Sequence, residues 1–195
     1  MNKKEPVRIL VCGMSRSGST LLVKMIRKYF KDHHKIEIPV VKPSALYKMI
    51  SKVTLTKSQR CLFPHKRAEF VRKKRMQRIE KFFKRQPHLI LKAHSLDSIQ
   101  EALRTDEHSN NFMDHFNSWF WCKRDLRDAS CSEFISIKTR ESPDHNLDRI
   151  KSSNDWSKIN EIFSTLKFEH DSWTDFYKNS EKNVHEWKYE DFKEN

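Results

Sequence analysis

A short turn near the N-terminus is the first stretch of this sequence with residues suited to chemistry. It contains Gly13 and Gly18, the only two glycines among 195 residues, and it ends in Ser19 and Thr20. The glycine spacing and the final threonine follow the P-loop pattern G-x-x-x-x-G-K-[ST], whose backbone N–H groups bind phosphate at a helix N-terminus. Ser19 replaces the lysine of that pattern, and Arg16 lies within the loop instead. The turn therefore predicts an anion site without the lysine that a nucleoside-triphosphate hydrolase requires.

A second pair of candidate residues follows an apolar segment in the middle of the chain. Arg124 comes shortly after the apolar run 118–122, and Ser132 follows eight residues later. If a strand ends at Arg124 and a helix begins after it, both side chains can bind one phosphate near the helix N-terminus. An arginine and a serine at this spacing mean little alone, so the prediction depends on their combination with the first loop.

The elements that must position these residues follow from the hydrophobic pattern. Short apolar runs typical of buried parallel strands occupy residues 7–12, 88–94, 118–122 and 183–189. Helical periodicity follows the first three runs, over residues 19–31, 96–103 and 129–137. This alternation predicts a three-layer α/β fold around a mostly parallel sheet, with a P-loop-like strand, turn and helix at its start. Ligands bind at the carboxyl ends of the strands in such sheets.

The remaining segments have weaker signals. Residues 39–64 contain three prolines and are predicted to form loops and short helices, and residues 140–155 are predicted to form a loop. Apolar residues at helical spacing over 155–179 predict a pair of helices that covers the core. The four cysteines form no C-x-x-C pair, so neither a disulfide framework nor a metal site is expected.

Positive charge is concentrated between Arg60 and Arg85, where eleven lysines or arginines accompany two acids, Glu69 and Glu80. The whole chain has a formal net charge of +13, which makes anionic partners the default expectation. Apolar residues at helical spacing predict that this stretch is a basic amphipathic helix. It is either a solvated helix face or a surface that attracts an anionic acceptor, nucleic acid or a membrane.

The motifs together resemble the sulfotransferases that use 3′-phosphoadenosine 5′-phosphosulfate (PAPS). In that family a modified P-loop, [KR]-[ST]-G-[ST]-[ST], binds the 5′-phosphosulfate, and its arginine form is similar to Arg16-Ser17-Gly18-Ser19-Thr20. The family's second signature is an arginine at a strand end and a serine eight residues later, both of which reach the 3′-phosphate. Arg124 and Ser132 match this signature. The resemblance extends from Val7 to Phe192.

Two shorter matches add further site residues to the resemblance. Leu91-Lys92-Ala93-His94 is similar to the strand-end Lys-x-His of the cytosolic branch. This match implies that His94 is the general base, and it makes Lys92 a further cation beside Arg16. The segment 187–192 resembles the Y-E-D motif, which implies that Tyr189 contacts the nucleotide, although a packing role suits Tyr189 equally well.

The sequence departs from the family in two places. Leu21 stands where cytosolic members have an aromatic residue that stacks on adenine, so adenine packing is expected from elsewhere. The family also continues beyond Y-E-D into a segment whose basic residues and glycine close over the 3′-phosphate, whereas this sequence stops at Asn195. We therefore expect one sulfotransferase-like domain over residues 1–195 without that segment. Either Arg127 or the basic stretch replaces it, or the chain is truncated or inactive.

The predicted function is transfer of a sulfuryl group from PAPS to a hydroxyl or amine, without a metal ion. The acceptor is expected to be a small molecule or a glycan, and the basic stretch suggests an anionic one. A P-loop kinase of a small substrate is one alternative, and a non-catalytic polyanion-binding module on the same fold is another. No apolar run approaches the roughly 18 residues of a membrane span, and the N-terminus lacks the apolar region of a secretory signal. A cytoplasmic protein without a nucleic-acid partner is expected, and the sequence predicts no oligomeric state.

Overall fold

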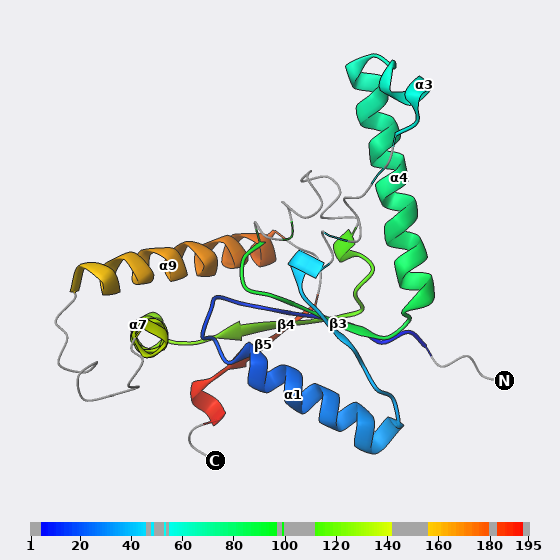
Figure 1. The fold of residues 1–195 in the computed structure, drawn as a ribbon. Helices are drawn as coiled ribbons and strands as arrows, with labels where there is room; N and C mark the ends of the chain where they lie inside the picture. The colour runs from blue at the N-terminus through cyan, green and yellow to red at the C-terminus, as the bar shows by residue number, and fades with distance from the viewer. Residues whose placement is uncertain are drawn as a thin grey trace.

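The computed structural model describes residues 5–45, 48, 53, 55–96, 99, 112–141, 156–179 and 183–192. Its centre is a five-stranded sheet with the order β2-β3-β1-β4-β5, in which all four neighbouring pairs are parallel (Figure 1). The strands are β1 (Arg8–Cys12), β2 (Val40–Val41), β3 (Leu89–Ala93), β4 (Ser118–Lys123) and β5 (Val184–Lys188). The predicted α/β class with a parallel sheet is therefore confirmed.

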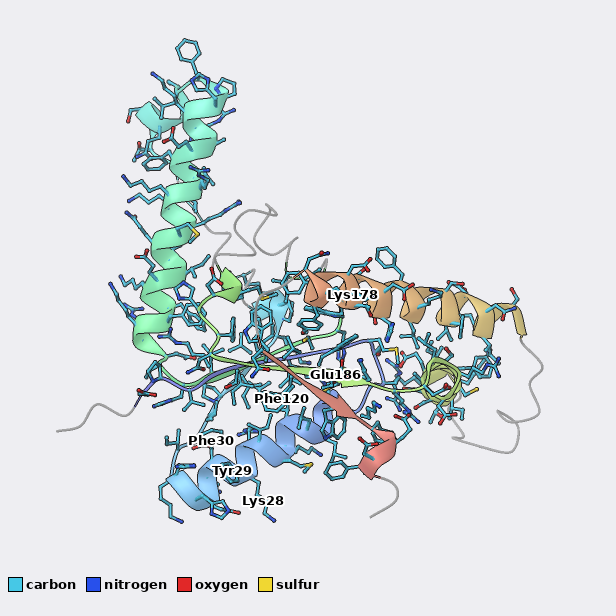
Figure 2. The ribbon with its side chains drawn as sticks, turned by 180° about the vertical axis from the view of Figure 1, so that it is seen from behind. Lys28, Tyr29, Phe30, Phe120, Lys178 and Glu186 are labelled. Carbon is cyan, nitrogen blue, oxygen red and sulfur yellow. The ribbon has the colours of Figure 1, made fainter. Side chains whose placement is uncertain are left out.

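Helices cover both faces of this sheet. They are α1 (Ser19–Tyr29), α3 (Lys57–Arg60), α4 (Pro64–Arg85), α7 (Leu126–Glu141) and α9 (Trp156–Lys178). Helix α1 lies on one face, whereas α4 and α9 lie on the other, so the molecule has the three layers that the sequence predicts (Figures 1 and 2). No helix in the described part of the chain is long and apolar enough to cross a membrane.

The central strand β1 shows why the sequence forms this arrangement. Its side chains alternate between the two faces, and both faces are buried, so nearly every residue of the strand is apolar. Leu10 and Cys12 join the core beneath α4 and α9, together with Trp173 of α9. Ile9 and Val11 join the second core beneath α1.

A third, smaller core joins α7 and α9 beside the turn that follows β1. Met14 of the turn is buried there against Ala129 and Phe134 of α7 and Leu166 of α9. This packing places α7 next to the predicted anion loop, although α7 is more than one hundred residues away along the chain.

Several predicted boundaries are wrong. Within the predicted segment 155–179, Trp156–Lys178 form the single 23-residue helix α9 and not a pair of helices, because no glycine or proline interrupts the segment and one apolar face runs along it. The first helix ends at Tyr29 and continues as a π-helical turn over Phe30–His34. The predicted loop segment 39–64 contributes the short strand β2, which pairs with β3.

Other predicted segments lie partly outside the described residues. Most of the predicted helix 96–103 and of the loop 140–155 belongs to this group. The helix predicted over 129–137 is present and begins earlier, at Leu126. The 3₁₀ turn Glu190–Phe192 follows β5.

The basic stretch forms the helix α4, as predicted, but most of this helix does not pack on the sheet. Only Ile79 and Phe83, in its last two turns, are buried in the core. Its N-terminal part projects away from the rest of the molecule (Figure 1). Because α4 leads directly into β3, its last turn lies at the amino edge of the parallel sheet.

Candidate functional site

The four candidate segments follow four neighbouring strands. The glycine loop follows β1, His94 follows β3, Arg124 follows β4 and Tyr189 follows β5. Parallel strands bring their carboxyl ends to the same edge, which is where α/β sheets bind ligands. The structure therefore brings together residues that are more than 170 positions apart in the sequence.

A cavity of about 540 Å³ lies at this edge. Nine predicted site residues line it, namely Arg16, Gly18, Ser19, Thr20, Lys92, His94, Arg124, Ser132 and Tyr189. The remaining predicted residue, Ser17, is fully buried. Ser15, Leu21, Glu133 and Arg140 also line the cavity and were not among the predicted residues.

The backbone of the loop explains why both glycines of the chain are located here. Gly13 has φ 141° and Gly18 has φ 83°, values that L side chains rarely adopt. A Cβ atom at Gly13 would lie 2.3 Å from the carbonyl oxygen of Cys122, and one at Gly18 would lie 2.6 Å from Cδ2 of Tyr189. Arg16 also has a positive φ, 64°, so three residues of this short turn adopt left-handed or related conformations.

Hydrogen bonds from two sides hold the loop. The Ser17 N–H donates to the Met14 carbonyl oxygen at 3.2 Å, which closes the turn. The Ser15 N–H donates to Oε2 of Glu169 on α9 at 2.9 Å. Helix α9 therefore supports the loop that connects β1 to α1.

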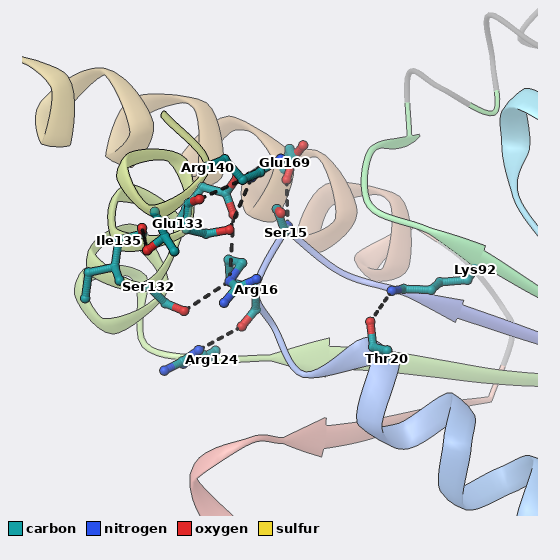
Figure 3. A network of polar contacts seen from close by, with 12 residues as sticks. Ser15, Arg16, Thr20, Lys92, Arg124, Ser132, Glu133, Ile135, Arg140 and Glu169 are labelled. Carbon is teal, nitrogen blue, oxygen red and sulfur yellow. Dashed lines mark hydrogen bonds and ion pairs between the residues drawn. The ribbon is translucent and has the colours of Figure 1, made fainter. Parts of the chain in front are cut away.

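Arg16 is the centre of a network of polar contacts with α7 (Figure 3). Its Nε donates to Oγ of Ser132 at 3.0 Å and lies 3.7 Å from Oε2 of Glu133. The other carboxylate oxygen of Glu133 lies 3.6 Å from Nη2 of Arg140. A carboxylate thus pairs with two guanidinium groups inside a cavity that is otherwise suited to anions, and any anion there competes with Glu133.

Arg124 is fixed by its neighbours. Its Nη1 donates to the backbone oxygen of Arg16 at 3.1 Å, and its guanidinium lies 4.5 Å from the ring centroid of Tyr189. Its Nε is buried and makes no hydrogen bond within the described part of the chain. Arg124 and Ser132 line the same cavity, as their spacing predicts, but both contact Arg16 and not each other.

The N-terminus of α7 differs from the expected phosphate site. Oδ1 of Asp125 accepts hydrogen bonds from the N–H groups of Arg127 and Asp128, at 2.9 and 3.0 Å. The helix is therefore capped by its own chain, and side chains rather than these N–H groups remain for an anion. The sequence analysis offered Arg127 as a substitute for the missing segment. Arg127 lines neither this cavity nor the second cavity described below, whereas Arg140 lines both.

Lys92 and His94 lie at the end of β3 and line the same cavity. The Lys92 Nζ donates to Oγ1 of Thr20 at 2.5 Å. Burial, followed by the nearby Lys42, lowers the pKa of Lys92. Burial and then the Lys92 ammonium lower the pKa of His94, so its imidazole is neutral at neutral pH. Trp173 Nε1 donates to the His94 carbonyl oxygen at 2.9 Å, which fixes this position.

A second cavity, of about 620 Å³, adjoins the first along α7. Arg16, Arg124, Ser132 and Arg140 line both cavities. Asp128, Cys131, Ile135, Ser136 and Thr139 complete the second one. The wall of the second cavity is partly apolar. Because four residues line both cavities, the two cavities border each other.

The sequence analysis missed Glu133, Arg140 and Glu169. Glu133 and Arg140 are seven residues apart, or two helical turns, so they share one face of α7. This spacing could have linked them to each other, but only the packing of α7 and α9 against Met14 shows that the face reaches the loop. The described residues contain no group of three or more His, Cys, Asp or Glu that could hold a metal ion.

The sequence matches no protein-family model and no curated protein. Three solved structures have a similar arrangement of elements at low sequence identity. Shikimate kinase from Bacteroides thetaiotaomicron is 12% identical with a TM-score of 0.47, and the match covers 93% of this chain and 85% of that one. A kinase from Chloroflexus aurantiacus, described as putative, is 14% identical with a TM-score of 0.38 and covers 77% and 78%. TT1252 from Thermus thermophilus is 11% identical with a TM-score of 0.33 and covers 91% and 100%.

Proposed function

We propose that this protein is a sulfotransferase that transfers a sulfuryl group from PAPS to a hydroxyl or amine acceptor. The observation that carries the proposal is one cavity at the ends of four strands, lined by four cationic side chains and a neutral histidine. The cations are Arg16, Lys92, Arg124 and Arg140. Sulfuryl transfer requires positive charge around the donor group and a base for the acceptor, and little else.

The residues of the cavity fit the two charged ends of PAPS. The glycines let Cys122, Trp187 and Tyr189 pack directly on the loop, and the loop lines the cavity beside Arg16 and Thr20, where its backbone would bind the phosphosulfate. Arg124 has a buried Nε without a hydrogen-bond partner in the described residues, and with Ser132 it would hold the 3′-phosphate. When bound, PAPS supplies a sulfuryl group on an activated phosphate.

His94 suits the role of general base. Its lowered pKa keeps the imidazole neutral, and a neutral imidazole can accept the proton of an acceptor hydroxyl or amine. The acid limb of kcat/KM for the donor, which reports on the free enzyme, is therefore expected below the ordinary histidine pKa of 6.5. Activity should persist in mildly acidic buffer and fall as the pH decreases through the pKa of His94. An acid limb above pH 6.5 would contradict this assignment.

Phosphoryl transfer from ATP is the second candidate. Gly13, Gly18 and Thr20 occupy the glycine and hydroxyl positions of a P-loop, and Lys92 supplies an ammonium that the loop itself lacks. Kinase is also the activity in the names of two of the similar structures, and none of the three is named a sulfotransferase.

The contact between Lys92 and Thr20 supports sulfuryl transfer over phosphoryl transfer. The P-loop hydroxyl of a kinase coordinates Mg²⁺, whereas Thr20 here accepts a hydrogen bond from an ammonium. A dication beside that ammonium would be repelled, so Mg²⁺ would first have to displace Lys92. Sulfuryl transfer has no such requirement, which is why it is our first candidate.

Nucleotide selectivity tests the proposal. Thermal unfolding should be measured with adenosine 3′,5′-bisphosphate, with adenosine 5′-phosphate and with ATP plus Mg²⁺. Stabilisation by the bisphosphate, at a concentration where the 5′-phosphate has less effect, is expected, because the 3′-phosphate adds contacts. Stabilisation by ATP with Mg²⁺ alone would instead support the kinase. No response to any nucleotide would leave only the polyanion-binding module. An acceptor screen with labelled PAPS then tests turnover.

A further inference from the structure

The basic surface at the N-terminal end of α4 does not line the cavity. Residues 57–67 comprise α3, the connection Cys61–Phe63 and the first turn of α4, and we call them the α3–α4 tip. Helix α4 has 22 residues and is therefore about 33 Å long, of which only the last two turns are buried in the core. The α3–α4 tip thus lies at the end of a projection, away from both faces of the sheet (Figures 1 and 2).

The α3–α4 tip exposes large apolar side chains. Phe63 is 70% exposed and Leu62 is 37% exposed, and they are adjacent in the connection between the two helices. Phe63 stacks on His65 with a centroid distance of 6.0 Å. Exposed apolar groups at the end of a projection favour an apolar environment outside the protein.

Basic side chains surround these apolar residues. Lys57 and Arg60 precede them and Lys66 and Arg67 follow them, and all four side chains belong to exposed residues. Between Lys57 and Arg75 the sequence has eight lysines or arginines and one acid, Glu69. This arrangement combines a strong positive charge with an apolar end.

We propose that the α3–α4 tip is a peripheral membrane-binding site for bilayers that contain anionic lipids. Leu62 and Phe63 enter the interfacial region, and the basic residues around them bind lipid phosphates and carboxylates. A soluble polyanion such as a nucleic acid would use the charge but would gain nothing from the apolar end. The projection of α4 lets the tip reach a flat surface without obstruction by the other helices and strands that the structure describes (Figure 1).

Co-sedimentation of the full chain with vesicles tests this proposal. Phosphatidylcholine vesicles with about 30% phosphatidylserine are expected to bind the protein at physiological salt, and vesicles of phosphatidylcholine alone to bind it at least about tenfold more weakly. The Leu62→Ser, Phe63→Ser double variant should lose about tenfold or more in affinity. Because Phe63 precedes the first residue of α4, serine there is a good N-cap and the helix should be retained.

Charge variants separate a local site from the overall net charge. Lys66→Glu with Arg67→Glu should weaken binding by about tenfold or more. Lys24→Glu with Lys28→Glu, on exposed positions of α1, changes the net charge equally and should weaken it by less than about threefold. Circular dichroism and thermal unfolding verify that each variant folds.

Three results would overturn the proposal. The protein could fail to bind vesicles with phosphatidylserine, the serine variant could bind as tightly as the unmodified chain, or the α1 variant could lose as much affinity as the α4 variant. Inorganic polyphosphate serves as a lipid-free probe. If it binds the serine variant and the unmodified chain equally while neither binds vesicles, the surface is a soluble polyanion site.

Discussion

Two regions of this molecule are rich in cations, the cavity at the carboxyl edge of the sheet and helix α4 at the amino edge, and they hold these cations differently. In the cavity, Arg16 contacts Ser132 and Glu133, and Arg124 lies between the Arg16 backbone and the Tyr189 ring. Every residue from Cys61 to Glu69, in the connection before α4 and in its first turns, is exposed. The α4 segment carries most of the net charge along one helix, whereas the cavity brings together cations from separate elements. Net charge alone therefore does not locate a small-ligand site, whereas the convergence of cations from different elements does.

Replacement of His94 should have the largest effect on the cavity. His94→Ala is expected to lower turnover by about 10²- to 10⁴-fold, because a general base contributes about that much. Binding of adenosine 3′,5′-bisphosphate should remain within about threefold, since His94 is uncharged at neutral pH. His185→Ala, at an exposed position on β5, is the control and should retain turnover. Unchanged turnover in His94→Ala would remove His94 from the reaction.

Replacement of Arg124 tests whether a fixed cation recognises the 3′-phosphate. Arg124→Ala should weaken binding of adenosine 3′,5′-bisphosphate by about 10- to 100-fold, because hydrogen bonds to charged groups contribute about 1.5–3 kcal/mol. Binding of adenosine 5′-phosphate should change much less. Titration calorimetry with both ligands measures the difference, and Arg127→Ala, which lies outside both cavities, is the matched control. Equal losses for the two ligands would contradict the assignment.

Neutralisation of Glu133 should change affinity in the opposite direction. Glu133→Gln removes the carboxylate that pairs with Arg16 and Arg140, so both guanidinium groups become available to a bound anion. These arginine side chains are 41% and 69% exposed, and the expected gain in bisphosphate affinity is therefore only about two- to fivefold. The gain should shrink in high salt. Glu161→Gln on α9 is the control, and weaker binding in Glu133→Gln would show that the carboxylate helps the ligand.

Charge reversal in the last turns of α4 should have the smallest effect on ligand affinity in the cavity. Lys81→Glu with Lys84→Glu is expected to change bisphosphate affinity by less than about twofold. Strand β3 separates the two edges with five residues, or about 16 Å, which is about twice the screening length of about 8 Å at physiological salt. The same calorimetric titration measures this change in bisphosphate affinity. A loss of tenfold would show that α4 contributes to the field in the cavity.

The comparison of sequence with structure depends on how local each signal is. The strands β1, β3, β4 and β5 could be predicted because each is a short apolar run, and the glycine loop because the two glycines of the chain occur there. Strand β2 has two residues, too few for a pattern, and exists because it pairs with β3. Glu133 and Glu169 reach the loop only through the packing of α7 and α9 on Met14, which no local pattern encodes.

The position of the basic stretch relative to the sheet could not be predicted from the sequence either. Its helical character follows from apolar spacing, but its direction depends on which of its turns pack on the sheet. Ile79 and Phe83 anchor only the end nearest β3, so the predicted substitute for a phosphate-closing segment lies at the wrong edge of the sheet. Arg140, on the face of α7 that borders the cavity, is the cation that the structure offers there instead.

The contact of Gly18 with Trp187 and Tyr189 has a consequence for the order of folding. The loop is synthesised before the aromatic rings that enclose it, which belong to β5 and the residue after it. Its final shape therefore requires contacts across almost the whole chain, which form slowly because such closure is entropically costly. A nascent chain that has released only β1 and α1 has every residue of the anion loop but not yet its surroundings. The protein thus acquires competence to bind an anion only after Trp187 and Tyr189 have been synthesised and have packed on the loop.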